Sequence, residues 1–159
     1  EITERKIDEE VVMRGMQSFV KARCNQCHVI AGHGINLGPD LTKISERMTG
    51  TKLLQQILEP STELNKQFQN HQFILEDGTV VSGVIVDETP KQYKIVSNLL
   101  NPNDFKRIDK NQIDEQIPSR ISAMPSGMLD VLTREEILDL LCFLESGGHK
   151  MELHGEGGH

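Results

Sequence analysis

The chain of 159 residues has no tryptophan, one tyrosine and three cysteines, and aromatic residues make up only 4% of it. It contains no long apolar run and no cluster of basic residues, which excludes a membrane-spanning helix. The formal net charge of −7 argues against binding to nucleic acid or to anionic membrane surfaces. The length suits one domain, or one domain with a sizeable insertion. The sequence shows neither an initiator methionine nor a signal peptide, so we expect a mature or excised segment.

The most informative residues are Cys24, Cys27 and His28, which form a Cys-x-x-Cys-His motif. This motif is the attachment signature of c-type haem. Two cysteines one helical turn apart can each form a thioether with one vinyl group of a haem, and the adjacent histidine then reaches the iron as an axial ligand. The sequence therefore predicts one covalently bound haem c. Its flat apolar ring would add volume to a core that has few aromatic side chains.

Two other kinds of site use cysteines at this spacing. A thioredoxin-like dithiol normally follows a strand and opens a helix, whereas Cys24 and Cys27 close a predicted helical segment. A structural zinc site needs a second ligand pair at similar spacing, and only Cys142 remains. We interpret Cys142, which lies among leucines, as a small buried apolar residue.

Helices are predicted towards both ends of the chain. Apolar residues recur at helical spacing over residues 8–23. Shorter helices are expected at 41–48 and 51–58. The last helix begins with a capping box, in which Thr133 is the N-cap residue and Glu136 lies at the third helical position.

A different pattern begins at Gln67. Four short strands are expected within 67–119, and the first two are joined by a tight turn at Asp77 and Gly78. The third and fourth cover 93–96 and 105–108. A meander of this size needs a partner surface or a barrel-like closure for stability. We interpret 67–119 as a small antiparallel β insertion within a mainly α-helical domain.

A haem that transfers electrons normally has a second axial ligand, most often methionine or histidine. Met124 is favoured because Pro125 pushes it out of helical geometry into an extended loop directly before the last helix. Met128 is expected to be helical and to pack against its neighbours. Met128, a histidine such as His71, and an open iron site remain the alternatives.

Taken together, these features resemble class I c-type cytochromes. The resemblance implies a mainly α cytochrome c fold over 8–146, in which the carbonyl of Pro39 accepts from the ring N–H of His28. It also implies that Gly15 and Phe19 of the first helix pack on an aromatic residue of the last. The residues that carry the resemblance are Gly15, Phe19, Cys24, Cys27, His28, Gly38, Pro39, Met124, Pro125 and Phe143.

Ordinary small cytochromes c carry no insertion like 67–119. Together with the segment 122–128, it resembles a haem-binding domain of Planctomycetes and Verrucomicrobia, which is often one module of a larger exported protein. The tail, 147–159, is rich in glycine and histidine. It could bind a metal, but three histidines on a flexible tail do not form a preorganised site, so we expect no defined structure there.

The predicted function is one-electron transfer by a monohaem c-type cytochrome with His28 and Met124 as iron ligands. Such a protein is not an enzyme, and we expect a transient redox protein as its partner. The motif places it on the exported side of a bacterial membrane, in the periplasm. One rival is a module that senses or binds NO or CO, if Met124 is absent from the iron or displaced. A haem peroxidase is the other rival, but the sequence shows no convincing pair of distal histidine and arginine.

Overall fold

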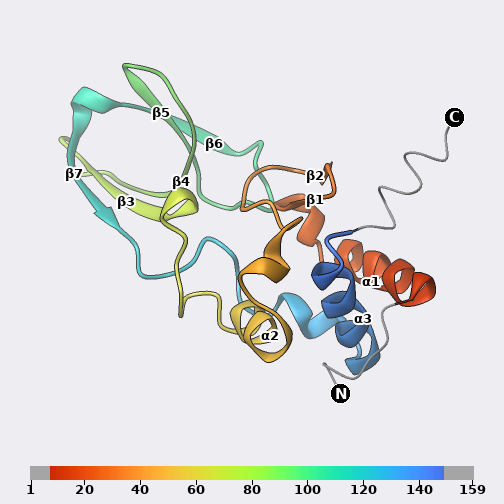
Figure 1. The fold of residues 1–159 in the computed structure, drawn as a ribbon. Coiled ribbons are helices and arrows are strands. Elements are labelled where there is room, and N and C mark those ends of the chain that lie inside the picture. The colour runs from red at the N-terminus through yellow and green to blue at the C-terminus, as the bar shows by residue number, and fades with distance from the viewer. Residues whose placement is uncertain (1–7, 149–159) are drawn as a thin grey trace, which may run out of the picture. The chain divides into compact units, whose positions relative to one another are not determined.

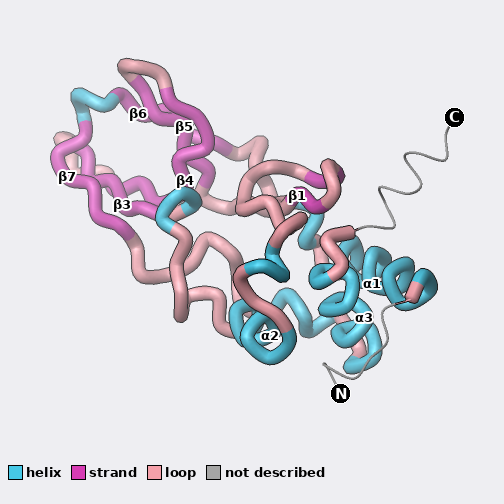
Figure 2. The backbone as a smooth tube through the Cα atoms, viewed as in Figure 1, coloured by secondary structure: helices cyan, strands magenta, loops and turns pink. Residues whose placement is uncertain are grey.

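The computed structural model describes residues 8–148, which divide into two compact units (Figure 1). Residues 8–59 and 126–148 form the first, which we call the helical unit. Pro60–Pro125 form the second, which we call the sheet unit. Figure 2 shows that the three α-helices lie in the helical unit and the longer strands in the sheet unit.

The helical unit is built on the helices α1, α2 and α3. Asp8 caps α1 by accepting from the N–H of Val11, and the predicted capping box of Thr133 and Glu136 at the start of α3 is confirmed. The longest helix has 13 residues, and no described helix is long and apolar enough to cross a membrane. The elements of this unit are α1 (Glu9–Lys21), η1 (Cys24–Gln26), β1 (Val29–Ile30), β2 (His33–Gly34), η2 (Ile44–Glu46), α2 (Gly50–Leu58), η5 (Met128–Val131) and α3 (Arg134–Glu145).

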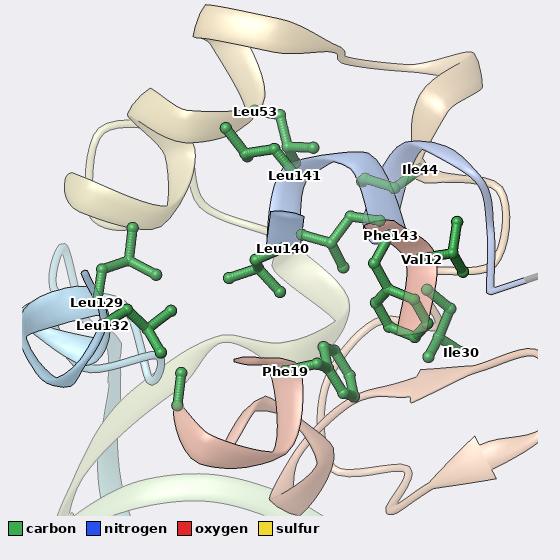
Figure 3. Close-up of a cluster of buried hydrophobic side chains, with 12 residues drawn as sticks. Val12, Phe19, Ile30, Ile44, Leu53, Leu129, Leu132, Leu140, Leu141 and Phe143 are labelled. Carbon is green, nitrogen blue, oxygen red and sulfur yellow. The ribbon is translucent and has the colours of Figure 1, made fainter. Parts of the chain in front are cut away.

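The packing of α1 against α3 forms the centre of the helical unit. The rings of Phe19 and Phe143 have centroids 5.5 Å apart, and Figure 3 shows them beside Ile30. A side chain on Gly15 would collide with the carbonyl oxygen of Asp139 and with Cβ of Phe143, so only glycine permits this close approach. The predicted packing of Gly15 and Phe19 on Phe143 is therefore confirmed.

Two ion pairs also join α1 to α3. Nε of Arg14 lies 2.9 Å from a carboxylate oxygen of Asp139, whose side chain is buried. Nζ of Lys21 lies 3.0 Å from the carboxylate of Glu136 at the start of α3. Removing Arg14 would leave the buried carboxylate of Asp139 without this ion pair, which is costly.

The sheet unit holds a five-stranded antiparallel sheet with the strand order β6-β5-β4-β3-β7. The predicted turn at Asp77 and Gly78 joins β3 to β4, and Gly78 adopts a φ of +84°, which favours glycine. The elements of this unit are η3 (Lys66–Phe68), β3 (Asn70–Leu75), β4 (Val80–Glu88), β5 (Gln92–Val96), β6 (Phe105–Asp109), η4 (Lys110–Gln112) and β7 (Ile113–Pro118).

This sheet curls around a core of its own. All five strands contribute apolar side chains to one cluster, which includes the buried Phe73 of β3 and Ile108 of β6 and the partly buried Ile113 of β7. Irregularities in register between β3 and β7 and between β4 and β5 allow the strands to bend. The short turn η4 joins β6 to β7, so the two edge strands of the sheet approach each other at that end.

The prediction of a mainly α fold is wrong. The strands contain about as many residues as the three α-helices, which have 13, 9 and 12 residues. Residues 41–48 form only the short turn η2 instead of a helix. The sheet also has a fifth strand, β7, which was not predicted because Ile113–Pro118 is an edge strand with few buried residues. Its polar sequence lacks the apolar alternation that indicates a strand.

Candidate haem site

The Cys-x-x-Cys-His motif forms one tight turn directly after α1. Arg23 has a φ of +65°, in the left-handed region that residues other than glycine rarely adopt, so the chain turns sharply there. The carbonyl of Cys24 then accepts from the N–H of Cys27 at 3.2 Å and from the N–H of His28 at 2.9 Å. This turn brings the two thiols and the imidazole together at the end of α1.

The thiol of Cys24 lies in an apolar environment. Cys24 is half-buried and packs against the hydrophobic core of the helical unit. Burial raises the pKa of its thiol to about 11, and burial also raises the pKa of the Cys27 thiol. Both thiols are therefore protonated at neutral pH. A redox dithiol needs a lowered thiol pKa, so this pair does not fit thioredoxin-like chemistry.

The imidazole of His28 is held in one orientation. Its Nδ1 lies 2.8 Å from the carbonyl oxygen of Pro39. A carbonyl oxygen can only accept, so Nδ1 carries the hydrogen and the lone pair of Nε2 is left for a metal. Burial lowers the pKa of His28, and the hydrogen bond to Pro39 offsets only part of this decrease. Burial thus favours the neutral imidazole, the form that binds iron.

Two glycines allow the backbone to pack closely around His28. A Cβ atom on Gly38 would lie 3.0 Å from Cε1 of the imidazole, and one on Gly34 would collide with the carbonyl oxygen of His28. Gly34 has a φ of +119°, which also favours glycine. The N–H groups of Leu37 and Gly38 donate to the carbonyl of Cys27, at 3.0 and 2.6 Å. The sequence signalled Gly38 through the adjacent proline but gave no signal for Gly34.

Two hydrogen bonds that the sequence did not predict fix the backbone at Leu41 and at Gly50. The N–H of Leu41 donates to the carbonyl of Val29 at 2.8 Å, which closes the loop against β1. Further along, the carboxylate of Glu145 on α3 accepts from the N–H of Gly50 at 2.6 Å, at the start of α2. A carboxylate at a helix N-terminus is favourable because it meets an unpaired N–H group and the positive end of the helix dipole.

The structure brings four of the five predicted site residues together: Cys24, Cys27, His28 and Pro39. Met124, the fifth, belongs to the sheet unit, so its ligation of the iron stays a prediction. It is half-buried and lies outside helices and strands, as predicted, and its N–H donates to Oγ of Ser122 at 3.1 Å.

The other histidines and methionines differ in their surroundings. Met128 begins η5, and His71 lies on β3 in the sheet unit with its Nδ1 buried and without a hydrogen-bond partner. Met16 and Met48 are partly buried against the core of the helical unit, where packing accounts for them. The histidines at 149, 154 and 159 lie outside the described residues.

The donor set of the helical unit fits a covalent haem better than a bare metal ion. Over residues 8–148, no three His, Cys, Asp or Glu side chains are grouped so that they could hold a metal ion. The motif instead offers two protonated thiols beside an apolar core and one oriented imidazole. Thioether bonds and one axial bond require this combination.

A family model for cytochrome c matches residues 12–79. This match supports a c-type cytochrome. A domain of this kind implies covalently bound haem c and a function in electron transfer. The matched segment includes most of α1, the haem motif, the loop with Pro39, and α2. No curated protein matches the chain.

Proposed function

We propose that this protein carries single electrons through one haem c, with His28 and Met124 as iron ligands. The observation that carries the proposal is the hydrogen bond of 2.8 Å between Nδ1 of His28 and the carbonyl of Pro39, which leaves Nε2 available beside the two thiols. When bound, the haem supplies reversible one-electron chemistry at its iron.

The residues of the helical unit would hold this group in three ways. Cys24 and Cys27 would each add an S–H bond across one vinyl group, so that a carbon–sulfur bond forms and the hydrogen passes to the neighbouring carbon. His28 would ligate the iron, and the carbonyl of Pro39 would orient the ring and increase its electron donation. The apolar side chains around α1 and α3 would exclude water.

Met124 is proposed as the second ligand because of its local structure. It lies in an irregular segment before Pro125 and precedes α3, whereas Met128 is part of the turn η5. A methionine raises the reduction potential relative to a second histidine, as suits an electron carrier. With both axial positions filled, the protein would perform no bond chemistry and would not act as an enzyme.

The proposed function includes a compartment, the periplasm, and a partner, another redox protein. Haem attachment to a Cys-x-x-Cys-His motif is expected on the exported side of a bacterial membrane, which favours the periplasm. The partner would be another redox protein that binds transiently, through an interface below about 1,200 Å² in total. Given the negative net charge, a basic patch on that partner would favour the encounter.

Covalent attachment can be tested by mass spectrometry of protein made with a c-type maturation system. The intact mass should include one haem, and the haem should stay with the chain after denaturation and extraction with acid and organic solvent. The double variant C24A/C27A should release it. A native chain without added haem mass would refute the proposal.

The second ligand can be tested by comparing M124A with the matched variant M128A. Loss of the Met124 thioether should abolish the weak charge-transfer band between methionine and ferric iron, lower the reduction potential and permit rapid CO binding. M128A should keep the properties of the native protein. If only M128A loses the band, Met128 is the ligand. If the native protein already binds CO rapidly, a gas-binding module replaces the electron carrier.

A further inference from the structure

The two edges of the five-stranded sheet differ in chemistry. On β7, the exposed side chains of Asp114 and Glu115 are acidic, and the strand ends at Pro118, which lacks an N–H group for pairing. The opposite edge strand, β6, contains no proline, and among residues 8–148 it pairs only with β5. The β6 edge is therefore the one that could accept a further strand.

The ring of Phe105 and the cations of Lys106 and Arg107 lie exposed on β6, and the half-buried Lys94 lies beside them on β5. Phe105 is 41% exposed, as one of eight large apolar side chains that are exposed in the described part of the chain. Nζ of Lys94 lies 4.2 Å from the centroid of this ring, and Cζ of Arg107 lies 5.5 Å from it. Because Lys94 pairs with Arg107 in the register of β5 and β6, the three side chains share one face of the sheet. Lys106, also exposed, points to the opposite face.

In the part of the chain that the structure describes, these cations form no ion pair, although Asp87 lies opposite Lys94 in the register of β4 and β5. The whole chain has a net charge of −7. We use the term "β6 edge" for Lys94, Phe105, Lys106 and Arg107. Positive charge on both faces of one unpaired strand repels a second β6 edge and attracts an acidic strand.

We propose that the β6 edge docks an extended acidic segment of a partner protein as an additional strand. The backbone of the segment would pair with β6, which gives affinity with little dependence on sequence. Carboxylates on one face would meet Lys94 and Arg107, and those on the other face would meet Lys106. Phe105 would supply the apolar contact, since aromatic residues and arginine are enriched in interfaces. This proposal does not depend on the haem.

The test measures binding of a fluorescently labelled peptide of glutamate and valine, whose backbone can form a strand, to the full chain by fluorescence anisotropy. The native protein should bind it at low ionic strength and lose affinity as salt is added. The variant K94E/R107E should bind at least about tenfold more weakly, because steering by opposite charge is reversed. The matched variant K43E/K52E changes two exposed lysines of the helical unit and should bind like the native protein.

Further controls separate strand addition from general attraction between charges. The same peptide with N-methylated backbone amides cannot pair as a strand and should not bind. K106E, on the other face, should weaken binding as well, and circular dichroism shows whether each variant keeps its sheet.

Four results would overturn the proposal. The first is no binding of the peptide to the native protein, and the second is equal binding of the N-methylated peptide. The third is tighter binding of a single-stranded oligothymidine, which would make the edge a nucleic-acid site. The fourth is reversible self-association that K94E/R107E abolishes, which would make the acidic edge of a second copy the occupant.

Discussion

The substitution Gly15→Ala tests the close packing of α1 against α3, because it adds one methyl group between the two helices. The new Cβ would collide with the carbonyl oxygen of Asp139 and with Cβ of Phe143. Both atoms are fixed by the backbone of α3 and cannot rotate away as the end of a long side chain can. The two helices must therefore move apart, which also disturbs the contact between the rings of Phe19 and Phe143.

The magnitude follows from two opposing terms. Overpacking a tight contact costs about 1–3 kcal/mol. Replacing glycine by alanine in a helix interior stabilises the helix by about 1 kcal/mol. Because the collision is with fixed atoms, we expect the upper part of the first range, and so a net loss of about 1–2 kcal/mol. Gly15→Val should cost more than Gly15→Ala because its side chain is larger.

Urea unfolding followed by helical circular dichroism measures this loss. All described α-helices belong to the helical unit, so the signal reports on that unit. The control is Gln17→Ala, an exposed position of the same helix, which should change stability by less than about 0.5 kcal/mol. Equal stability of Gly15→Ala and Gln17→Ala would refute the close approach of α1 and α3.

Four further predictions concern single positions. Gly38→Ala should displace the imidazole of His28, because its Cβ would lie 3.0 Å from Cε1. The shift in the iron–histidine stretching frequency is measured in the ferrous M124A background, where the iron is five-coordinate and this vibration can be observed. Thr133→Ala should destabilise the helical unit by about 1 kcal/mol in urea, through loss of the N-cap hydrogen bond. The hydrogen bond from the backbone N–H of Thr133, and then the one from Lys21, lower the pKa of Glu136 in the folded protein. The ionised carboxylate therefore stabilises the fold fully above the unfolded pKa of about 4.3, and this stabilisation is lost as the pH falls through the lower folded pKa. Glu136→Gln should make the free energy of unfolding less dependent on pH in this acidic range. Gly83→Val should unfold or loosen the sheet in hydrogen exchange, since its Cβ would lie 2.6 Å from Cγ2 of Ile95.

Features of the fold and of the site that depend on residues close together in the sequence could be predicted. The capping box of α3 and the turn at Asp77 and Gly78 depend on residues within a few positions of one another. The hydrogen bond between His28 and Pro39 was anticipated through the resemblance to cytochromes c, and residues only 11 positions apart make it.

Features that depend on tertiary packing could not be predicted in this way. Residues 41–48 have apolar residues at helical spacing, yet only Ile44–Glu46 form a turn, because packing of Ile44 in the core fixes the segment. The strand β7 has few buried residues, so its pairing with β3 left no alternation in the sequence. Gly34 meets His28 only because the chain doubles back in the hairpin β1–β2, which no pattern in the sequence indicated.

The hydrogen bond between the N–H of Ser122 and Oγ of Ser61, at 3.0 Å, has a consequence for the order of folding. It joins the two ends of the sheet unit, whose strands pair mainly with their neighbours in sequence and so need few long loops to close. Once this unit has folded, the flexible chain between α2 and α3 is much shorter, and the entropy lost when α3 meets α1 is smaller. We expect pulse-labelled hydrogen exchange to protect β3 and β4 before α1. Until α3 docks, Cys24 and Cys27 would remain open to the machinery that attaches the haem.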